Sequence, residues 1–113
     1  MVVGELGEAE VDRIFHALAD ATRRDIVNRV LHTGQSVSAL ARHYPMSFAA
    51  VQKHVAVLER AALVTKERRG REQVVHGNPE ALRKAAHLLQ AYERIWRDRV
   101  HGIDQILNED QER

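Results

Sequence analysis

The chain has 113 residues and a formal net charge of +1, with 17 Lys and Arg against 16 Asp and Glu. This length suits one domain with a modest, mainly aliphatic core, which chains of this size often complete with a partner chain. The chain has no cysteine, which excludes disulfides, thiolate metal sites, cysteine nucleophiles and thiol redox sensing. The near-zero charge excludes a general polycation but permits a local basic patch.

The N-terminal stretch MVVGELGEAEVDR is acidic and has no basic region followed by an apolar core. That is not the pattern of a signal peptide. No run of about 18 apolar residues occurs anywhere, so no membrane span is expected. We therefore expect a cytoplasmic protein that does not bind membranes.

The first third of the chain predicts three helices. Residues 8–19 form the first, because apolar side chains recur on one face at Val11, Ile14, Phe15 and Leu18. Asp20 can cap a second helix, which starts at Ala21 and stops near Gly34, a residue type favoured after helix ends. Ser36 can cap a short third helix. The side chains expected inside the second and third helices are Ile26, Val27, Val30, Leu31, Val37, Leu40 and Ala41.

Residues 46–64, MSFAAVQKHVAVLERAALV, predict a fourth helix, which Pro45 separates from the third. Ser47 caps this helix, which runs to about Arg60. One face is apolar and carries Val51, Val55, Leu58 and Ala62. The other face is short, polar and mildly basic, with Ser47, Phe48, Gln52, Lys53, Ala56 and Arg60.

A hairpin and a long helix follow. Two β-prone runs flank Arg69 and Gly70 in LVTKERRGREQVVHG, which predicts a two-stranded hairpin over residues 64–76. Asn78 as cap and Pro79 in the first turn then predict a last helix to about Leu107, followed by a frayed tail over residues 108–113. Its apolar positions are Leu82, Ala85, Leu88 or Leu89, Tyr92, Ile95 or Trp96, Val100, Ile103 and Leu107.

The expected order is therefore helix, helix, short helix, helix, strand, strand, helix. A short helix, a tight turn and a second helix form a helix-turn-helix unit, and a hairpin directly after it makes the unit winged. The fold class that follows is mostly α with a small β-hairpin wing, in a single α+β domain over residues 1–113.

Positive charge is concentrated in the fourth helix and the hairpin. Between Ser47 and Arg71, six basic residues stand against two acidic ones, a net +4, whereas residues 104–113 carry a net −3. A basic cluster of this kind suits DNA phosphates, because each neutralised phosphate releases counterions. The sequence thus favours a helix that lies in the major groove of DNA.

Individual contacts can be assigned to this surface. Gln52 can bind adenine with two hydrogen bonds, Lys53 can reach guanine or a phosphate, and Phe48 can contact a thymine methyl. The hairpin tip is expected to enter the adjacent minor groove or to hold its phosphates through Arg68, Arg69 and Arg71.

Four segments, LADATRRDIVNRVL, SVSALARHY, MSFAAVQKHVAVLERAALV and RRGRE, resemble the ArsR/SmtB family of bacterial winged-helix repressors over roughly residues 11–78. The resemblance implies a homodimer that binds a palindromic operator and leaves it when an inducer binds. It implies that residues 47–60 are the recognition helix and 64–76 the wing. The positions that match the family's DNA contacts are Ser47, Gln52, Lys53 and His54 in the helix, and Arg69 and Arg71 in the wing. His54 lies next to Val55 and is expected either to contact DNA or to pack against the protein.

In the homodimer, the N- and C-terminal helices are expected to form the interface through Phe15, Leu88, Tyr92, Ile95, Trp96 and Ile103. An apolar effector pocket lined by Tyr92 and Trp96 is the alternative. The sequence departs from the family at Ala21, which is often Pro, at Phe48, which is often polar, and at Ala62, which is often Gly. Glycine is favoured at this last position if its φ is positive, where alanine costs about 1 kcal/mol.

Metal-sensing members of the family use a Cys-x-Cys pair in the third helix or an Asp-x-His pair in the last. The matching segment SVSALAR has no cysteine, and the last helix has Ala85-x-His87 instead. His87 and His101 lie about 21 Å apart along one helix. Only an antiparallel dimer could therefore join His87 of one chain to His101 and Asp104 of the other in a zinc site. We expect no metal and no cofactor, with that site as the alternative.

One other class of protein remains as an alternative, and a second is not expected. The basic helix could dock an acidic protein, which would make the chain a protein–protein interaction module. An enzyme is not expected, because the chain has no Gly-rich phosphate loop, no nucleophile beside a base and no carboxylate pair in an apolar setting. The main prediction is a DNA-binding repressor without thiol-based metal sensing, whose effector the sequence does not identify.

Overall fold

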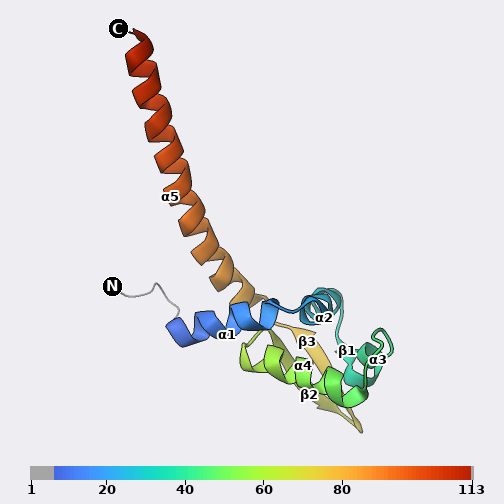
Figure 1. Cartoon of the computed structure of the whole chain (residues 1–113). Coiled ribbons are helices and arrows are strands. Elements are labelled where there is room, and N and C mark those ends of the chain that lie inside the picture. The colour runs from blue at the N-terminus through green and yellow to red at the C-terminus, as the bar shows by residue number, and fades with distance from the viewer. Residues whose placement is uncertain (1–6, 113) are drawn as a thin grey trace.

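The computed structural model describes residues 7–112, with side chains to Leu107. Within this range the elements are α1 (Glu8–Leu18), α2 (Ala21–His32), β1 (Gln35–Ser36), α3 (Val37–Ala41), α4 (Phe48–Arg60), β2 (Val64–Arg69), β3 (Glu72–Gly77) and α5 (Pro79–Glu112) (Figure 1). None of these helices has both the length and the apolar character that a membrane span requires. The stretch considered as a signal peptide lies partly outside the described residues, which begin at Gly7.

The helices begin at the predicted capping residues. The side chains of Asp20, Ser36 and Ser47 each accept a hydrogen bond from the backbone N–H three residues later, at 3.0, 3.0 and 3.1 Å. These N–H groups have no partner inside their own helix, so the side-chain oxygens stabilise the first turn. The predicted starts of α2, α3 and α4 are confirmed.

The end of α2 differs from the prediction. The helix ends at His32, and Thr33 after it is extended at φ −160° and ψ 142°, so no glycine in a left-handed conformation terminates it. Gly34 instead permits a close approach, since a Cβ at this position would lie 2.6 Å from the His76 ring. Leu31, predicted to be inside, is 43% exposed.

The hairpin belongs to a three-stranded antiparallel sheet with the strand order β1-β3-β2. β1 was not predicted, because two residues are too few to show an alternating pattern. β2 and β3 pair along their full length and leave Gly70 and Arg71 as a two-residue turn, one residue later than predicted. Gly70 has a φ of +62°, the positive value that the first turn residue of a type II′ hairpin requires.

One apolar core joins α1, α2, α3, α4, the sheet and the first turns of α5. Among the residues with described side chains, no polar or charged residue is buried. The largest fully buried side chains are Ile14, Ile26, Leu40, Leu58, Leu63, Val51, Val55, Val64 and Val75. The predicted inward face of α4 is therefore confirmed for Val51, Val55 and Leu58.

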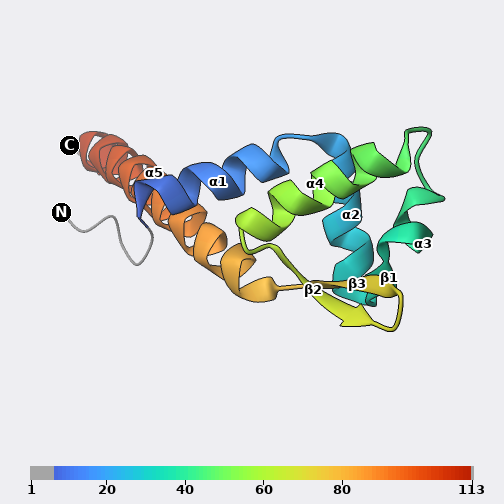
Figure 2. The same ribbon diagram turned by 90° about the horizontal axis from the view of Figure 1, so that it is seen from below.

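α5 projects away from this core (Figures 1 and 2). Its first turns pack on the domain through Ala81 and Ala85, which are buried. The remainder gives the chain its elongated shape, with extents of 74 × 31 × 20 Å. The helix continues past Leu107 to Glu112, so the expected fraying after Leu107 is wrong for the backbone of residues 108–112. These residues are mostly good helix formers and include neither glycine nor proline.

Candidate nucleic-acid interface

α4 presents the predicted polar face to solvent. Gln52 and Lys53 are exposed in its first half, and Phe48 is 47% exposed in its first turn. The Ser47 hydroxyl accepts the N–H of Ala50, but a hydroxyl that accepts still has its own proton to donate. The start of α4 therefore offers two hydrogen-bonding side chains, one ammonium group and one apolar ring on the same exposed surface.

α4 passes into β2 through a Schellman motif at Ala62. The N–H of Leu63 donates to the carbonyl of Leu58 at 3.0 Å, and the N–H of Ala62 donates to that of Glu59 at 2.9 Å. Ala62 has a φ of +59°, so the condition under which glycine is favoured here is met. Ala62 itself is exposed, which corrects its predicted place on the inward face. Nδ2 of Asn78 donates to the Ala62 carbonyl at 2.9 Å and joins this junction to the start of α5.

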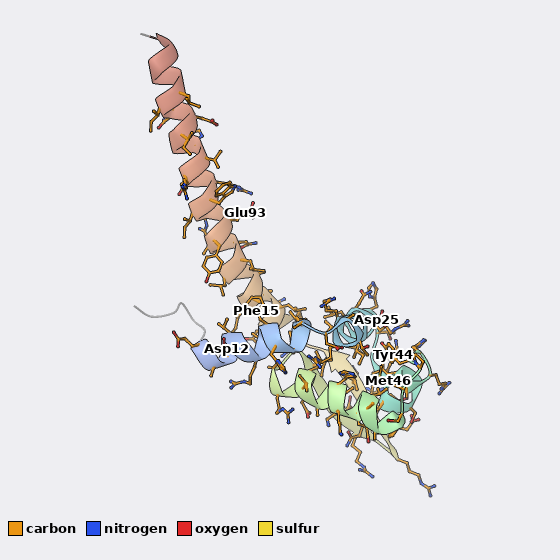
Figure 3. The ribbon with its side chains drawn as sticks, viewed as in Figure 1. Asp12, Phe15, Asp25, Tyr44, Met46 and Glu93 are labelled. Carbon is orange, nitrogen blue, oxygen red and sulfur yellow. The ribbon has the colours of Figure 1, made fainter. Side chains whose placement is uncertain are left out.

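The turn before α4 is held by a cluster that the sequence did not predict. The Tyr44 hydroxyl donates to Oδ2 of Asp25 at 2.6 Å, and Nε of Arg29 donates to the same oxygen at 2.7 Å. Burial, and then the Asp25 carboxylate, raise the pKa of Tyr44 to about 12. The Tyr44 hydroxyl, and then Arg29, lower the pKa of Asp25. Figure 3 shows Tyr44 beside Asp25 and above Met46, where the turn leads into α4.

The wing carries its basic residues at its tip. Arg68, Arg69 and Arg71 are all exposed around the turn between β2 and β3. Arg69 lies 3.3 Å from Glu67, which also lies 3.1 Å from Nε2 of His76. The hydrogen bond from Arg69, followed by that from His76, lowers the pKa of Glu67. The Glu67 carboxylate thus stays ionised and offsets part of the positive charge at the tip.

Ion pairs reduce the free positive charge of the surface but leave much of it available. Lys66 of β2 lies 3.3 Å from Glu59 of α4 and ties the wing to the helix. Among the described residues, no acidic side chain lies within salt-bridge distance of Lys53, Arg68 or Arg71. Arg60, near the end of α4, is also exposed and likewise absent from these ion pairs.

His54 lies on α4 but its side chain turns toward the junction between α1 and α2. Its Nδ1 lies 3.3 Å from Nη1 of Arg23 and 3.9 Å from Oδ2 of Asp20. The side chain is only 22% exposed. The structure therefore separates His54 from Gln52 and Lys53, the other helix positions predicted to contact DNA.

The residues predicted for the dimer interface lie on α1 and α5. Tyr92, Ile95 and Trp96 are 59%, 66% and 62% exposed on the projecting part of α5. Phe15 of α1 is also exposed and lies at the foot of α5 (Figure 3). Leu88 is half-buried. The same exposed apolar surface includes Leu89, Val100, Ile103, Ile106 and Leu107, of which the sequence analysis missed Ile106.

The candidate metal ligands do not meet within one chain. His101 and Asp104 lie one turn apart on α5 and line a shallow hollow with Trp96, but Tyr92 is not part of it. His87 is about 21 Å away along the helix. Among the described residues, no three His, Cys, Asp or Glu side chains come close enough together to hold a metal ion.

Comparison with known proteins identifies the family. The chain is 38% identical over 97 residues to the HTH-type transcriptional regulator Rv2034 of Mycobacterium tuberculosis. The matched region covers 86% of this chain and 88% of that protein. It is 34% identical to the solved structure of an ArsR-like transcriptional regulator from Rhodococcus sp. RHA1, with a TM-score of 0.79 over 89% of this chain and 93% of that one. The chain belongs to the ArsR family of helix-turn-helix transcriptional regulators.

The ArsR fold recurs in a more distant structure. The homodimeric winged helix-turn-helix DNA-binding domain of Mb0332 from Mycobacterium bovis is 22% identical and superposes with a TM-score of 0.62 over 75% of this chain and 80% of that one. No family model matches the chain. The predicted fold class and family are confirmed, and in this ArsR-family chain α3 and α4 form the helix-turn-helix while β2 and β3 form the wing.

Proposed function

We propose that this chain is a homodimeric transcriptional repressor that binds a palindromic operator through α4 and the wing, and that it does not sense metals through thiols. The observation that carries this proposal is the charge distribution on a winged helix-turn-helix. Residues 47–71 hold a net +4, and among the described residues Lys53 of α4 and Arg68 and Arg71 of the wing tip have no acidic side chain within salt-bridge distance.

The exposed start of α4 fits the major groove. That groove is about 12 Å wide and admits one helix with its side chains. Gln52 can pair with the edge of adenine, Lys53 can reach guanine or a phosphate, and Phe48 can meet a thymine methyl group. Ser47 keeps a hydroxyl proton for a phosphate oxygen, because its accepting lone pair already binds the helix N-terminus.

The wing then lies beside the groove that α4 occupies. Arg68 and Arg71 are exposed at its tip and suit phosphates or a narrow minor groove. Arg69 can join them, although Glu67 holds it in the free protein. Phosphate contacts set the register of the protein on DNA, whereas the side chains of α4 set the base preference.

The dimer is supported by the apolar surface of α1 and α5. A monomer would leave Tyr92, Ile95 and Trp96 more than half exposed on one continuous helix face, which soluble monomers rarely do. Residues 1–113 would then act as one domain whose terminal helices pair with those of a second copy. The related Mb0332 domain is described as homodimeric and DNA-binding. A repressor of this kind works on chromosomal DNA in the cytoplasm, and no catalytic step is part of this role.

The proposal is tested by fluorescence anisotropy. Double-stranded DNA selected by the purified protein from a random-sequence pool is compared with a scrambled version of the same DNA. Tight binding to the selected DNA alone supports the proposal. Equal binding to both DNAs would refute sequence-specific recognition and would favour an acidic protein as the partner.

Two variants locate the surface. Lys53→Ala is expected to weaken binding about tenfold, which corresponds to the loss of one good base or phosphate contact. Arg83→Ala removes an exposed arginine from α5 and is the matched control, with unchanged affinity expected. The assay is run in EDTA and then in zinc. Release of DNA by zinc would contradict the metal-free mechanism and would implicate His87, His101 and Asp104.

A further inference from the structure

The carboxyl end of α1 is capped by two arginines of α2. The last carbonyl groups of a helix have no partner within it. Nε of Arg23 donates to the Ala17 carbonyl at 2.7 Å, and Nη2 donates to the His16 carbonyl at 3.0 Å. Nη1 of Arg24 donates to the Leu18 carbonyl at 2.7 Å. The pair of arginines in the TRR segment therefore ties the start of α2 to the end of α1.

Arg23 makes a further contact that Arg24 does not make. Its Nη1 lies 3.3 Å from Nδ1 of His54, which is on α4. A guanidinium only donates, so Nδ1 is the acceptor in this contact. The planar guanidinium holds its nitrogen atoms in a rigid arrangement, so its three contacts constrain α1 and α4 together. Asp20 completes the cluster, because its Oδ2 accepts the backbone N–H of Arg23.

The helices joined by Arg23 have different proposed partners. α1 contacts both α4 and α5, and its Phe15 is exposed at the foot of α5 on the proposed dimer surface (Figure 3). α4 carries the proposed base contacts. In a symmetric dimer, the distance between the two copies of α4 depends on how each α4 is placed relative to α1 and α5 of its own chain, the helices proposed to form the interface. That separation sets the half-site spacing that the dimer accepts.

We propose that Arg23 is a positioning residue for DNA recognition. Through His54 it fixes α4 against the end of α1, and so sets the half-site spacing of the operator. This inference rests on the proposed function as a DNA-binding homodimer. Neither Arg23 nor His54 touches DNA in this role, which also explains why His54 faces the protein while Gln52 and Lys53 are exposed.

The chain supplies a matched control in Arg24. It caps the same end of α1 with a bond of the same length as that from Nε of Arg23, but it has no contact with His54 among the described hydrogen bonds. If the arginines only stabilise α1, Arg23→Gln and Arg24→Gln will behave alike. If Arg23 positions α4, only Arg23→Gln will change DNA recognition.

The experiment measures spacing preference. Half-sites that the wild-type protein selects from random-sequence DNA are joined in pairs with the selected spacing, or with one or two base pairs added or removed. Affinity for each duplex, and for a single half-site, is measured by anisotropy. Arg23→Gln is expected to lower the preference for the selected spacing about fivefold or more, within the usual range of coupling between sites. Its single half-site affinity should stay within about twofold of wild type.

Variants of His54 test the same contact from the other helix. His54→Ala removes the acceptor and should reproduce the loss of spacing preference. His54→Asn places an amide oxygen near the position of Nδ1 and should retain the preference. The double variant Arg23→Gln/His54→Ala should lose little more of the spacing preference than either single variant, because both substitutions remove the same interaction. Circular dichroism checks the fold, and His54→Ala carries the test if Arg23→Gln does not fold.

Three results would overturn the inference. One is an unchanged spacing preference in folded Arg23→Gln or His54→Ala protein. Another is an equal loss of preference in Arg24→Gln. The third is a fall in single half-site affinity in His54→Ala that matches its fall on the paired sites, because His54 would then contact DNA itself. Failure of the wild-type protein to select any DNA would instead overturn the proposed function, which separates the two ideas.

Discussion

Replacing Ala62 with glycine should stabilise the protein. Ala62 ends the Schellman motif between α4 and β2 with a φ of +59°, where a Cβ comes too close to the following carbonyl oxygen. The motif keeps its two backbone hydrogen bonds in the variant, because neither involves the side chain. The Ala62 methyl is exposed, so its removal forfeits no core packing.

The expected gain is small but measurable. Relief of the left-handed backbone strain is worth about 1–2 kcal/mol. Glycine also raises the conformational entropy of the unfolded chain, which lowers the free energy of unfolding by about 0.4–1 kcal/mol. The middle of these two ranges leaves a net gain of about 0.8 kcal/mol in the free energy of unfolding. For a chain of this size the midpoint of thermal unfolding should rise by about 2–6 °C.

The assay is thermal unfolding followed by circular dichroism, at one fixed protein concentration because dimers melt in a concentration-dependent way. Ala61→Gly is the control. Ala61 is buried and has a φ of −83°, so glycine there relieves no strain and removes a packed methyl group. It should lower the midpoint. A lower midpoint for Ala62→Gly as well would refute the argument from backbone strain.

Three further predictions follow from the interface and the turn cluster. Arg71→Ala should weaken binding to all DNA sequences alike and lower the slope of log affinity against log salt by about one unit; an unchanged slope would show that Arg71 meets no phosphate. Trp96→Asp should give monomers in light scattering that bind the operator poorly, and a fully dimeric variant would show that α5 is not the interface. Tyr44→Phe should lower the free energy of unfolding by about 1 kcal/mol, because it removes a hydrogen bond to the Asp25 carboxylate. The pKa of Asp25 is lower in the folded protein than in the unfolded chain, so its contribution is present above the ordinary value of 3.8 and is lost as the pH falls below it. The free energies of unfolding of Tyr44→Phe and wild type should therefore differ above this pH and converge below it. A difference that is constant at every pH would contradict the role assigned to Asp25.

Local chemistry let the sequence predict most of the elements. Asp20, Ser36 and Ser47 bind N–H groups only three residues away, so the helix starts depend on neighbours that the sequence shows directly. The apolar spacing of α4 likewise predicts its buried face, and Gly70 predicts the turn of the hairpin. The polar and basic positions of α4 and the wing could be assigned for the same reason, because a residue's place on a regular helix or hairpin follows from its number.

Tertiary structure alone decided the features that join distant segments. Gly34 is required by the close approach of His76 from β3, and the two residues of β1 are a strand only through their pairing with β3. The bond from Tyr44 to Asp25 spans 19 positions, and that between Arg23 and His54 spans 31.

No periodicity relates residues so far apart, because such contacts depend on how helices cross and not on where each begins. The sequence by itself therefore predicted which helix has an exposed polar face, the face that we propose binds DNA. The packing of α1, α2 and α4 determined how that helix is held, and it placed His54, for which DNA contact and packing were both predicted, against Arg23.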